Sequence, residues 1–70
     1  MKYIITDKDE VRLGGSFHQI MAEDCEGHVI SAGHCEKNPD GTFRVFGESI
    51  GYGIKAKQED ATRLQELATK

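Results

Sequence analysis

The chain has 70 residues, of which 37% are hydrophobic and 30% are charged, and its formal net charge is −3. This length holds one small domain, residues 1–70, and it excludes α/β-hydrolases and dinucleotide-binding enzymes with a separate substrate domain. Leu, Ile, Val and Phe make up 15 residues, just above the level of about 20% below which chains usually stay disordered. We therefore expect a folded domain with a small core.

Charge and cysteine content bear on the compartment and on the class of partner. The apolar stretch after Met1 is too short for a signal peptide, and no run approaches the roughly 18 apolar residues of a membrane span. Cys25 and Cys35 are too few for a disulfide framework, so we expect a cytoplasmic protein with reduced thiols and no membrane contact. The nine basic residues are scattered and form no stripe that could neutralise phosphates, so we expect no nucleic acid among its partners.

The N-terminal part of the sequence predicts a β-hairpin. Lys2–Thr6 is apolar and β-favouring, residues 7–10 are a charged turn, and Val11–Leu13 alternates in the way a strand does. Two glycines then end the second strand.

A short helix is predicted next, from Phe17 to about Asp24. Apolar residues at positions 17, 20 and 21 have the i, i+3, i+4 spacing of a single apolar stripe. Ser16 and Gln19 have the spacing of a capping box, which predicts that the Ser16 side chain caps this helix.

Three strands and a turn follow the helix. His28–Glu36 predicts a strand, and the Asn-Pro-Asp-Gly sequence at 38–41 matches the preferences of a type I turn. Thr42–Phe46 is the partner strand, with residues 43 and 45 on one face and residues 44 and 46 on the other. Because both faces carry bulky apolar residues, we expect a central strand or one covered on each side. Ile50–Ala56 alternates between apolar residues and glycine or lysine, so it predicts a further strand.

The C-terminal segment predicts a helix from Gln58 to about Thr69. Glu59 and Asp60 suit the positive end of the helix dipole, and Glu59 has the i, i+4 spacing to pair with Arg63. The sequence thus predicts an α+β fold: an antiparallel sheet of four to five strands with a short internal helix and a C-terminal helix, packed on one face.

Five residues offer metal-ligating side chains: His18, Cys25, His28, His34 and Cys35. Two thiolates and two imidazoles are a ligand set for tetrahedral zinc. His34 and Cys35 are adjacent in a predicted strand, however, so their side chains would point to opposite faces of the sheet. Zinc binding is therefore the alternative hypothesis, and the competing interpretation is one buried cysteine with exposed histidines. We expect no other cofactor.

Two arrangements could indicate catalysis. Residues 47–51 match the G-x-S-x-G pattern, but a nucleophile elbow needs a strand–turn–helix and a later histidine, and all three histidines precede Ser49. A thiolate nucleophile needs an imidazole adjacent in space, which Cys25 and His28 could achieve only across a turn. We interpret the serine motif as a chance match and expect no enzyme activity.

Two glycine-containing segments are candidate contact surfaces. The glycine pair at 14–15 precedes the first helix and could present N–H groups to an anion, but it has no basic neighbour and also ends the hairpin. Gly51 and Gly53 leave one strand face bare beside Lys55 and Lys57, so a partner's backbone could approach there. The alternative is that a helix of this chain packs on the same face.

Several segments together resemble a known group of proteins: Lys2–Thr6, Val29–Gly33, Gly47-Glu48-Ser49, and the ending from Gly53-Ile54-Lys55 to Glu59-Asp60. They resemble small proteins of bacteria and their phages, in which a short strand precedes a histidine-containing helix. A "SAG" strand, a "G-x-S" segment and a C-terminal Glu-Asp helix follow.

The resemblance implies an accessory protein of phage or prophage origin with no assigned activity, and it matches His18 to the helix histidine. The chain departs from the pattern at His34, where an aromatic or apolar residue is expected, and at Gln58, where proline is expected. The first departure weakens a metal role for His34.

The leading hypothesis is a non-enzymatic protein-interaction module with an unidentified protein partner. It follows from the small size, the acidic character and the lack of a catalytic set. The sheet edges and the surface of Gly51, Gly53, Lys55 and Lys57 are the expected contacts, and edge pairing could also give a homodimer.

Overall fold

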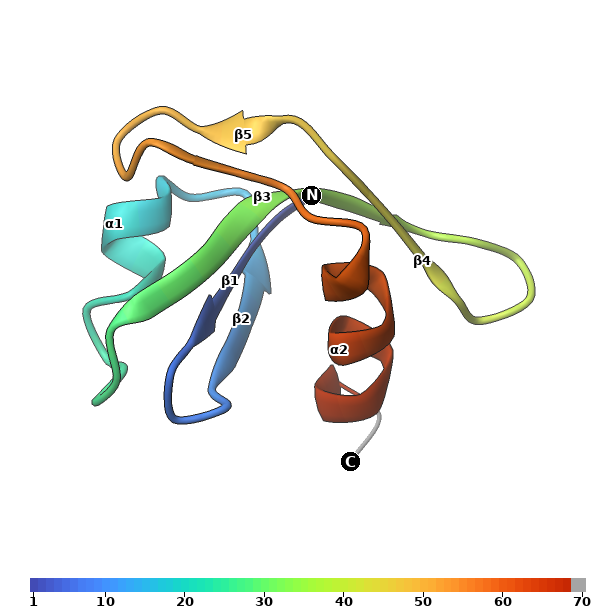
Figure 1. Cartoon of the computed structure of the whole chain (residues 1–70), viewed down its shortest axis with the longest axis horizontal. Helices are drawn as coiled ribbons and strands as arrows, with labels where there is room; N and C mark the ends of the chain where they lie inside the picture. Colours follow the sequence, from blue (N-terminus) through green and yellow to red (C-terminus); the bar gives the residue numbers. More distant parts are fainter. Residues whose placement is uncertain (69–70) are drawn as a thin grey trace.

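A computed structural model describes residues 1–68 of the chain. Its largest unit is a four-stranded antiparallel sheet in the order β2-β1-β3-β4, and a second, two-stranded sheet pairs β5 with β6. The strands are β1 (Lys2–Thr6), β2 (Val11–Gly14), β3 (Val29–Lys37), β4 (Phe43–Phe46), β5 (Glu48–Ser49) and β6 (Ile54–Lys55). The helices are α1 (His18–Met21) and α2 (Glu59–Ala68), and Figure 1 shows β5 and the turn after it reaching from β4 towards α1. The predicted α+β class is confirmed.

The central strand β1 is covered on both faces. Tyr3 and Ile5 belong to a cluster that includes Leu64 of α2, whereas Ile4 between them packs with Met21 of α1. All three residues are fully buried, which explains why the middle of this strand is apolar and does not alternate. The prediction that helix packs on only one face is therefore wrong.

The two sides of the sheet bury unequal cores. The larger core lies on the α2 side and consists of Tyr3, Ile5, Cys35, Phe43, Val45 and Leu64. The smaller core lies on the α1 side and consists of Ile4, Met21 and Ala32. The smaller core contains only three of the buried described residues, so it covers little of the α1 side of the sheet.

The predicted hairpin, the third strand and the turn at 38–41 are confirmed. The N–H of Gly41 donates a 3.0 Å hydrogen bond to the carbonyl oxygen of Asn38, as expected of a type I turn. In β4, Phe43 and Val45 share one face, as predicted, and are buried, whereas the two residues that alternate with them are exposed. β4 lies at the edge of the sheet, so the prediction of a central strand or one covered on both faces is wrong.

The first helix is shorter than predicted, and Ser16 does not cap it. The helix covers only His18–Met21, and its N-cap residue is Phe17, with no side-chain cap hydrogen bond. Beyond it, the N–H groups of Glu26 and Gly27 donate to the Glu10 carboxylate at 2.9 and 2.7 Å. These bonds hold residues 26 and 27 as a loop against the β1–β2 turn.

The predicted continuous strand at 50–56 is wrong. The N–H of Tyr52 donates to the carbonyl oxygen of Ser49 and that of Gly53 to Ile50, at 3.3 and 3.2 Å, so the chain makes a tight turn there. Gly53 has φ +65°, a conformation that glycine adopts at little cost. The turn overrides the alternating pattern and leaves Ile50 87% exposed.

The C-terminal helix matches the prediction over the described residues. It begins at Glu59, and the predicted end at Thr69 lies outside the described residues. Arg63 pairs with Asp9 of the β1–β2 turn and not with the predicted partner Glu59, which ties α2 to the hairpin. Among residues 1–68, no helix is long and apolar enough to cross a membrane.

Candidate functional site

Two histidines meet on the α1 side of the sheet. His18 is 8% exposed and donates from Nε2 to the carbonyl oxygen of Gly33, 2.9 Å away. His34 lies on β3 between Lys2 of β1 and Phe46 of β4, and its ring stacks on Phe46 with centroids 5.7 Å apart. The two imidazole centroids are 6.0 Å apart at an interplanar angle of 85°.

These histidines line a pocket of about 360 Å³, called here the imidazole pocket. It forms where the start of β1, α1, β3, β5 and the turn after β5 come together. Its residues are Lys2, Phe17, His18, Gln19, His34, Glu48, Ser49, Ile50 and Gly51. Sequence patterns draw attention to the two histidines, Ser49 and Gly51 as candidate site residues, but not to the other five.

Positive charge surrounds His34. Burial lowers the pKa of His34, and the neighbouring His18, Lys2 and N-terminal ammonium lower it further. The Lys2 ammonium lies 5.0 Å from the centroid of the Phe17 ring, a cation–π distance that holds it beside the pocket. An anion in the pocket would meet this positive charge.

Ser49 contributes a hydroxyl group without a partner. The residue is 1% exposed, and among the described residues its Oγ is the one buried side-chain polar atom that makes no hydrogen bond. It therefore forms no hydrogen bond with either imidazole. Ser49 lies on β5 and is followed by a turn and β6, whereas a nucleophile elbow joins a strand to a helix.

The structure disperses the five predicted metal ligands. Cys35 is buried in the core on the α2 side, on the opposite face of β3 from His34, as its position in the strand predicted. Cys25 packs at the edge of the smaller core, and His28 lies just before β3 begins. Only His18 and His34 come together, and residues 1–68 contain no group of three His, Cys, Asp or Glu side chains placed to hold a metal ion.

Both cysteines are free thiols in environments that disfavour the thiolate. Burial raises the pKa of Cys35, and desolvation likewise raises the pKa of Cys25 despite the nearby Arg12. Neither has the lowered pKa that marks a reactive cysteine.

The four residues of the predicted contact surface lie in different surroundings. Gly51 lines the imidazole pocket, where a Cβ would lie 2.9 Å from the Gln19 amide nitrogen. Gly53 faces open space, and Lys55 is exposed on β6. Lys57 lies beside α2 and donates its N–H to Asp60 at 3.1 Å. The single strand face on which this surface was predicted does not exist.

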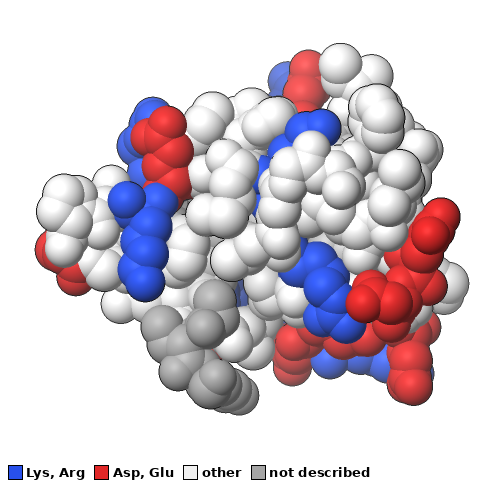
Figure 2. Space-filling model, turned by 180° about the vertical axis from the view of Figure 1, so that it is seen from behind, with Lys and Arg blue, Asp and Glu red and all other residues white. Residues whose placement is uncertain are grey.

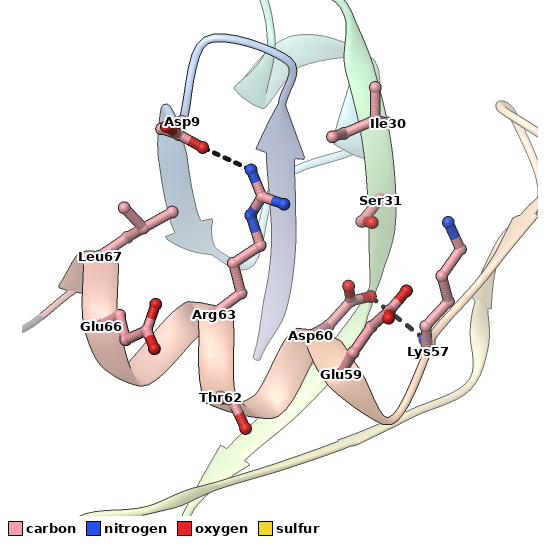
Figure 3. Close-up of a pocket in the computed structure, with 10 residues that line it drawn as sticks. All are labelled: Asp9, Ile30, Ser31, Lys57, Glu59, Asp60, Thr62, Arg63, Glu66 and Leu67. Carbon is pink, nitrogen blue, oxygen red and sulfur yellow. Dashed lines mark hydrogen bonds and ion pairs between the residues drawn. The ribbon is translucent and has the colours of Figure 1, made fainter.

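A wider groove of about 910 Å³ lies between α2 and the sheet. Figure 3 shows Arg63 reaching from α2 to Asp9 and Asp60 turned towards the backbone of Lys57. Arg63 and Asp60 of this groove thus already have partners within the chain, whereas the Ser49 hydroxyl of the imidazole pocket has none.

The charged side chains do not form a basic stripe on the face shown in Figure 2. Lys and Arg are scattered among uncharged residues, and the acidic side chains gather mostly at one end.

Comparison of the chain with models of protein families, with curated proteins and with solved structures finds no match. The function must therefore be argued from the geometry of the site.

Proposed function

We propose that this chain is a non-enzymatic protein-binding module and that the imidazole pocket with its apolar rim forms the contact surface. The observation that carries the proposal is the exposure of two large apolar residues at the pocket: Phe17 is 70% exposed and Ile50 is 87% exposed. Large apolar side chains grouped beside a pocket favour a binding role over ordinary surface.

The two rim residues come from separate segments. Phe17 precedes α1, and Ile50 begins the turn after β5, so the fold brings them to one pocket from positions far apart in the sequence. Burying these side chains against a partner would add a favourable hydrophobic term that the isolated chain lacks.

Other parts of the sequence interpretation stay as predictions. These are the phage or prophage origin, the cytoplasmic location and a homodimer formed through a sheet edge. The outer edges of β2 and β4 are unpaired within the described part of the chain, so a second strand could add there.

A selection from random peptides displayed on phage tests the proposed function even though the partner is unidentified. The immobilised wild-type chain is the bait, and clones that also bind the support without the chain are removed. We expect a consensus sequence whose synthetic peptide binds Phe17→Ser and Ile50→Ser about tenfold more weakly than wild type.

The matched control is Leu13→Ser, which removes a 38% exposed aliphatic side chain from β2, away from the pocket. This variant should bind the selected peptide as wild type does. A selection that yields no consensus, or peptides that bind the two rim variants as tightly as wild type, would contradict the proposal.

A further inference from the structure

We propose that the imidazole pocket binds the side-chain carboxylate of an acidic residue that lies within an apolar segment of the partner protein. This inference rests on the proposed function and names the chemistry of the segment that the pocket recognises. Three features carry it: the charge of the lining, its free hydrogen-bonding group and the position of the apolar rim.

The charged and titratable groups around the pocket favour an anion. Lys2 comes from β1, His18 from α1 and His34 from β3, and the N-terminal ammonium is close enough to lower the pKa of His34. Glu48 of β5 is the opposing charge in the lining. It is exposed, and Lys55 lies directly opposite it on β6, where a cross-strand pair of opposite charges is favourable.

The hydrogen-bonding groups favour an acceptor. The unpartnered Ser49 hydroxyl can donate one hydrogen bond, and the Gln19 side-chain amide in the same lining can donate others. A neutral imidazole has one N–H group. The N–H of His18 donates to the Gly33 carbonyl oxygen, so the N–H of His34 is the one available to donate to a ligand. A carboxylate only accepts hydrogen bonds, so it satisfies these donors at once, whereas a lysine or arginine of a partner could not.

The apolar rim favours a residue inside a segment over a free chain end. Phe17 and Ile50 belong to different parts of the fold, so a bound segment has apolar contacts available from more than one side. A C-terminal carboxylate is typically captured by successive backbone N–H groups, whereas the donors of this pocket include the side chains of Lys2, His34 and Ser49.

Carboxylate binding also couples to protonation. The bound anion stabilises the imidazolium form of His34, whose pKa is lowered in the free chain, so binding takes up a proton. We therefore expect the affinity for an acidic segment to rise as the pH falls through the range in which histidine titrates.

Three N-acetylated pentapeptides test the inference. The first is acetyl-Ala-Leu-Glu-Leu-Ala amide, the second replaces its glutamate with glutamine, and the third carries the glutamine with a free C-terminal carboxylate. Each is titrated into the ¹⁵N-labelled chain at about pH 6 and about pH 8, and the amides of Ser49 and Gly51 and the His34 imidazole signals are followed.

We expect the glutamate peptide to shift these signals, to bind at least about fivefold more tightly than the glutamine peptide, and to bind more tightly at the lower pH. Lys2→Gln should weaken its binding by about fivefold. The matched control is Lys37→Gln, which removes the same charge at the C-terminal end of β3, from a residue that does not line the pocket. Ser49→Ala should weaken the glutamate peptide and leave the glutamine peptide unchanged.

Equal binding of the glutamate and glutamine peptides overturns the inference but leaves an apolar protein-binding surface in place. Preference for the free C-terminus overturns it in favour of chain-end recognition. Shifts with none of the peptides overturn it as well, and the peptide selection described above then decides separately whether the chain binds proteins at all. Equal loss in the Lys2 and Lys37 variants would show that only net charge matters and would also overturn it.

Discussion

The hydroxyl group of Tyr3 donates a 2.5 Å hydrogen bond to Oδ2 of Asp60, which joins the first strand to the last helix. Both residues are almost fully buried. The same carboxylate oxygen accepts the N–H of Lys57 at 3.1 Å, so Asp60 also satisfies backbone just before α2 begins. One buried carboxylate thereby fixes where the helix starts and where it docks on the sheet.

Tyr3→Phe removes this hydrogen bond without leaving a cavity. It leaves the buried Asp60 carboxylate with one donor fewer, so we expect a loss of about 1.5–3 kcal/mol in the free energy of unfolding. Urea denaturation followed by circular dichroism measures it. Tyr52→Phe is the control, because the Tyr52 hydroxyl forms no hydrogen bond to another described residue. Equal stability of Tyr3→Phe and wild type would show that Asp60 finds a replacement donor.

The same pair predicts a loss of stability in alkali. Burial raises the pKa of Tyr3 above its usual value of 10.0, and the hydrogen bond to Asp60 raises it further. A folded-state pKa above the unfolded one means that the stabilisation is complete below pH 10.0 and is lost as the pH rises above it. The unfolding free energy of wild type should therefore fall more steeply above that pH than that of Tyr3→Phe, and parallel curves would contradict this.

The environment of Glu10 predicts a loss of stability in acid. Backbone N–H groups of Glu26 and Gly27 and the hydroxyl of Thr6 lower the pKa of Glu10 below its usual value of 4.5. A lowered folded-state pKa gives stability that is present above pH 4.5 and is lost as the pH falls through the folded value. Glu10→Gln should be less stable near neutral pH and lose less on acidification. Glu23→Gln, which changes an exposed carboxylate, should follow the wild-type pH curve.

Gly33 has no room for a side chain. A Cβ there would lie 2.9 Å from the Cβ of Ala56 and 3.1 Å from the carbonyl oxygen of Phe46, and the backbone oxygen cannot easily move. We expect Gly33→Ala to cost about 1–3 kcal/mol in unfolding free energy. Gly15→Ala meets nothing within 4 Å and should change stability by less than about 0.5 kcal/mol. Thermal and urea unfolding of both variants compare them directly.

Ser49→Ala should not destabilise the chain. The buried Oγ has no hydrogen-bond partner, so its removal relieves an unsatisfied polar group and should raise the unfolding free energy by up to about 1 kcal/mol. Ser16→Ala should be nearly neutral, because Ser16 is exposed and does not cap α1. A clear destabilisation of Ser49→Ala would mean that its hydroxyl has a partner after all.

The sequence predicted the elements whose signals are local. The strand at Lys2–Thr6 and the turn at 38–41 follow from β propensity and turn chemistry, which act over a few residues. The length of α1 and the break at 50–53 were missed. Gly53 adopts a left-handed turn conformation that overrides the alternation, and the segment after α1 is held at residues 26 and 27 by Glu10, which is distant in the sequence.

The candidate site was harder to predict than the fold. The alternation of side chains along β3 correctly predicts that His34 and Cys35 lie on opposite faces of the sheet, because that placement depends on one strand alone. The meeting of His18 and His34 with Ser49 depends on how α1 and β5 dock, and no local pattern encodes that. Phe17 was assigned to the apolar stripe of a helix, so its exposure could not be anticipated from its spacing.

Because Leu64 and Asp60 of α2 cover Tyr3 and Ile5 of β1, the first strand depends on residues that the ribosome adds last among the described ones. During translation, a nascent chain that has left the ribosome as far as β4 contains all four strands of the large sheet but lacks α2, which covers the larger apolar side of that sheet. That side stays open to water, and to chaperones or aggregation, until α2 has left the ribosome and packed on it.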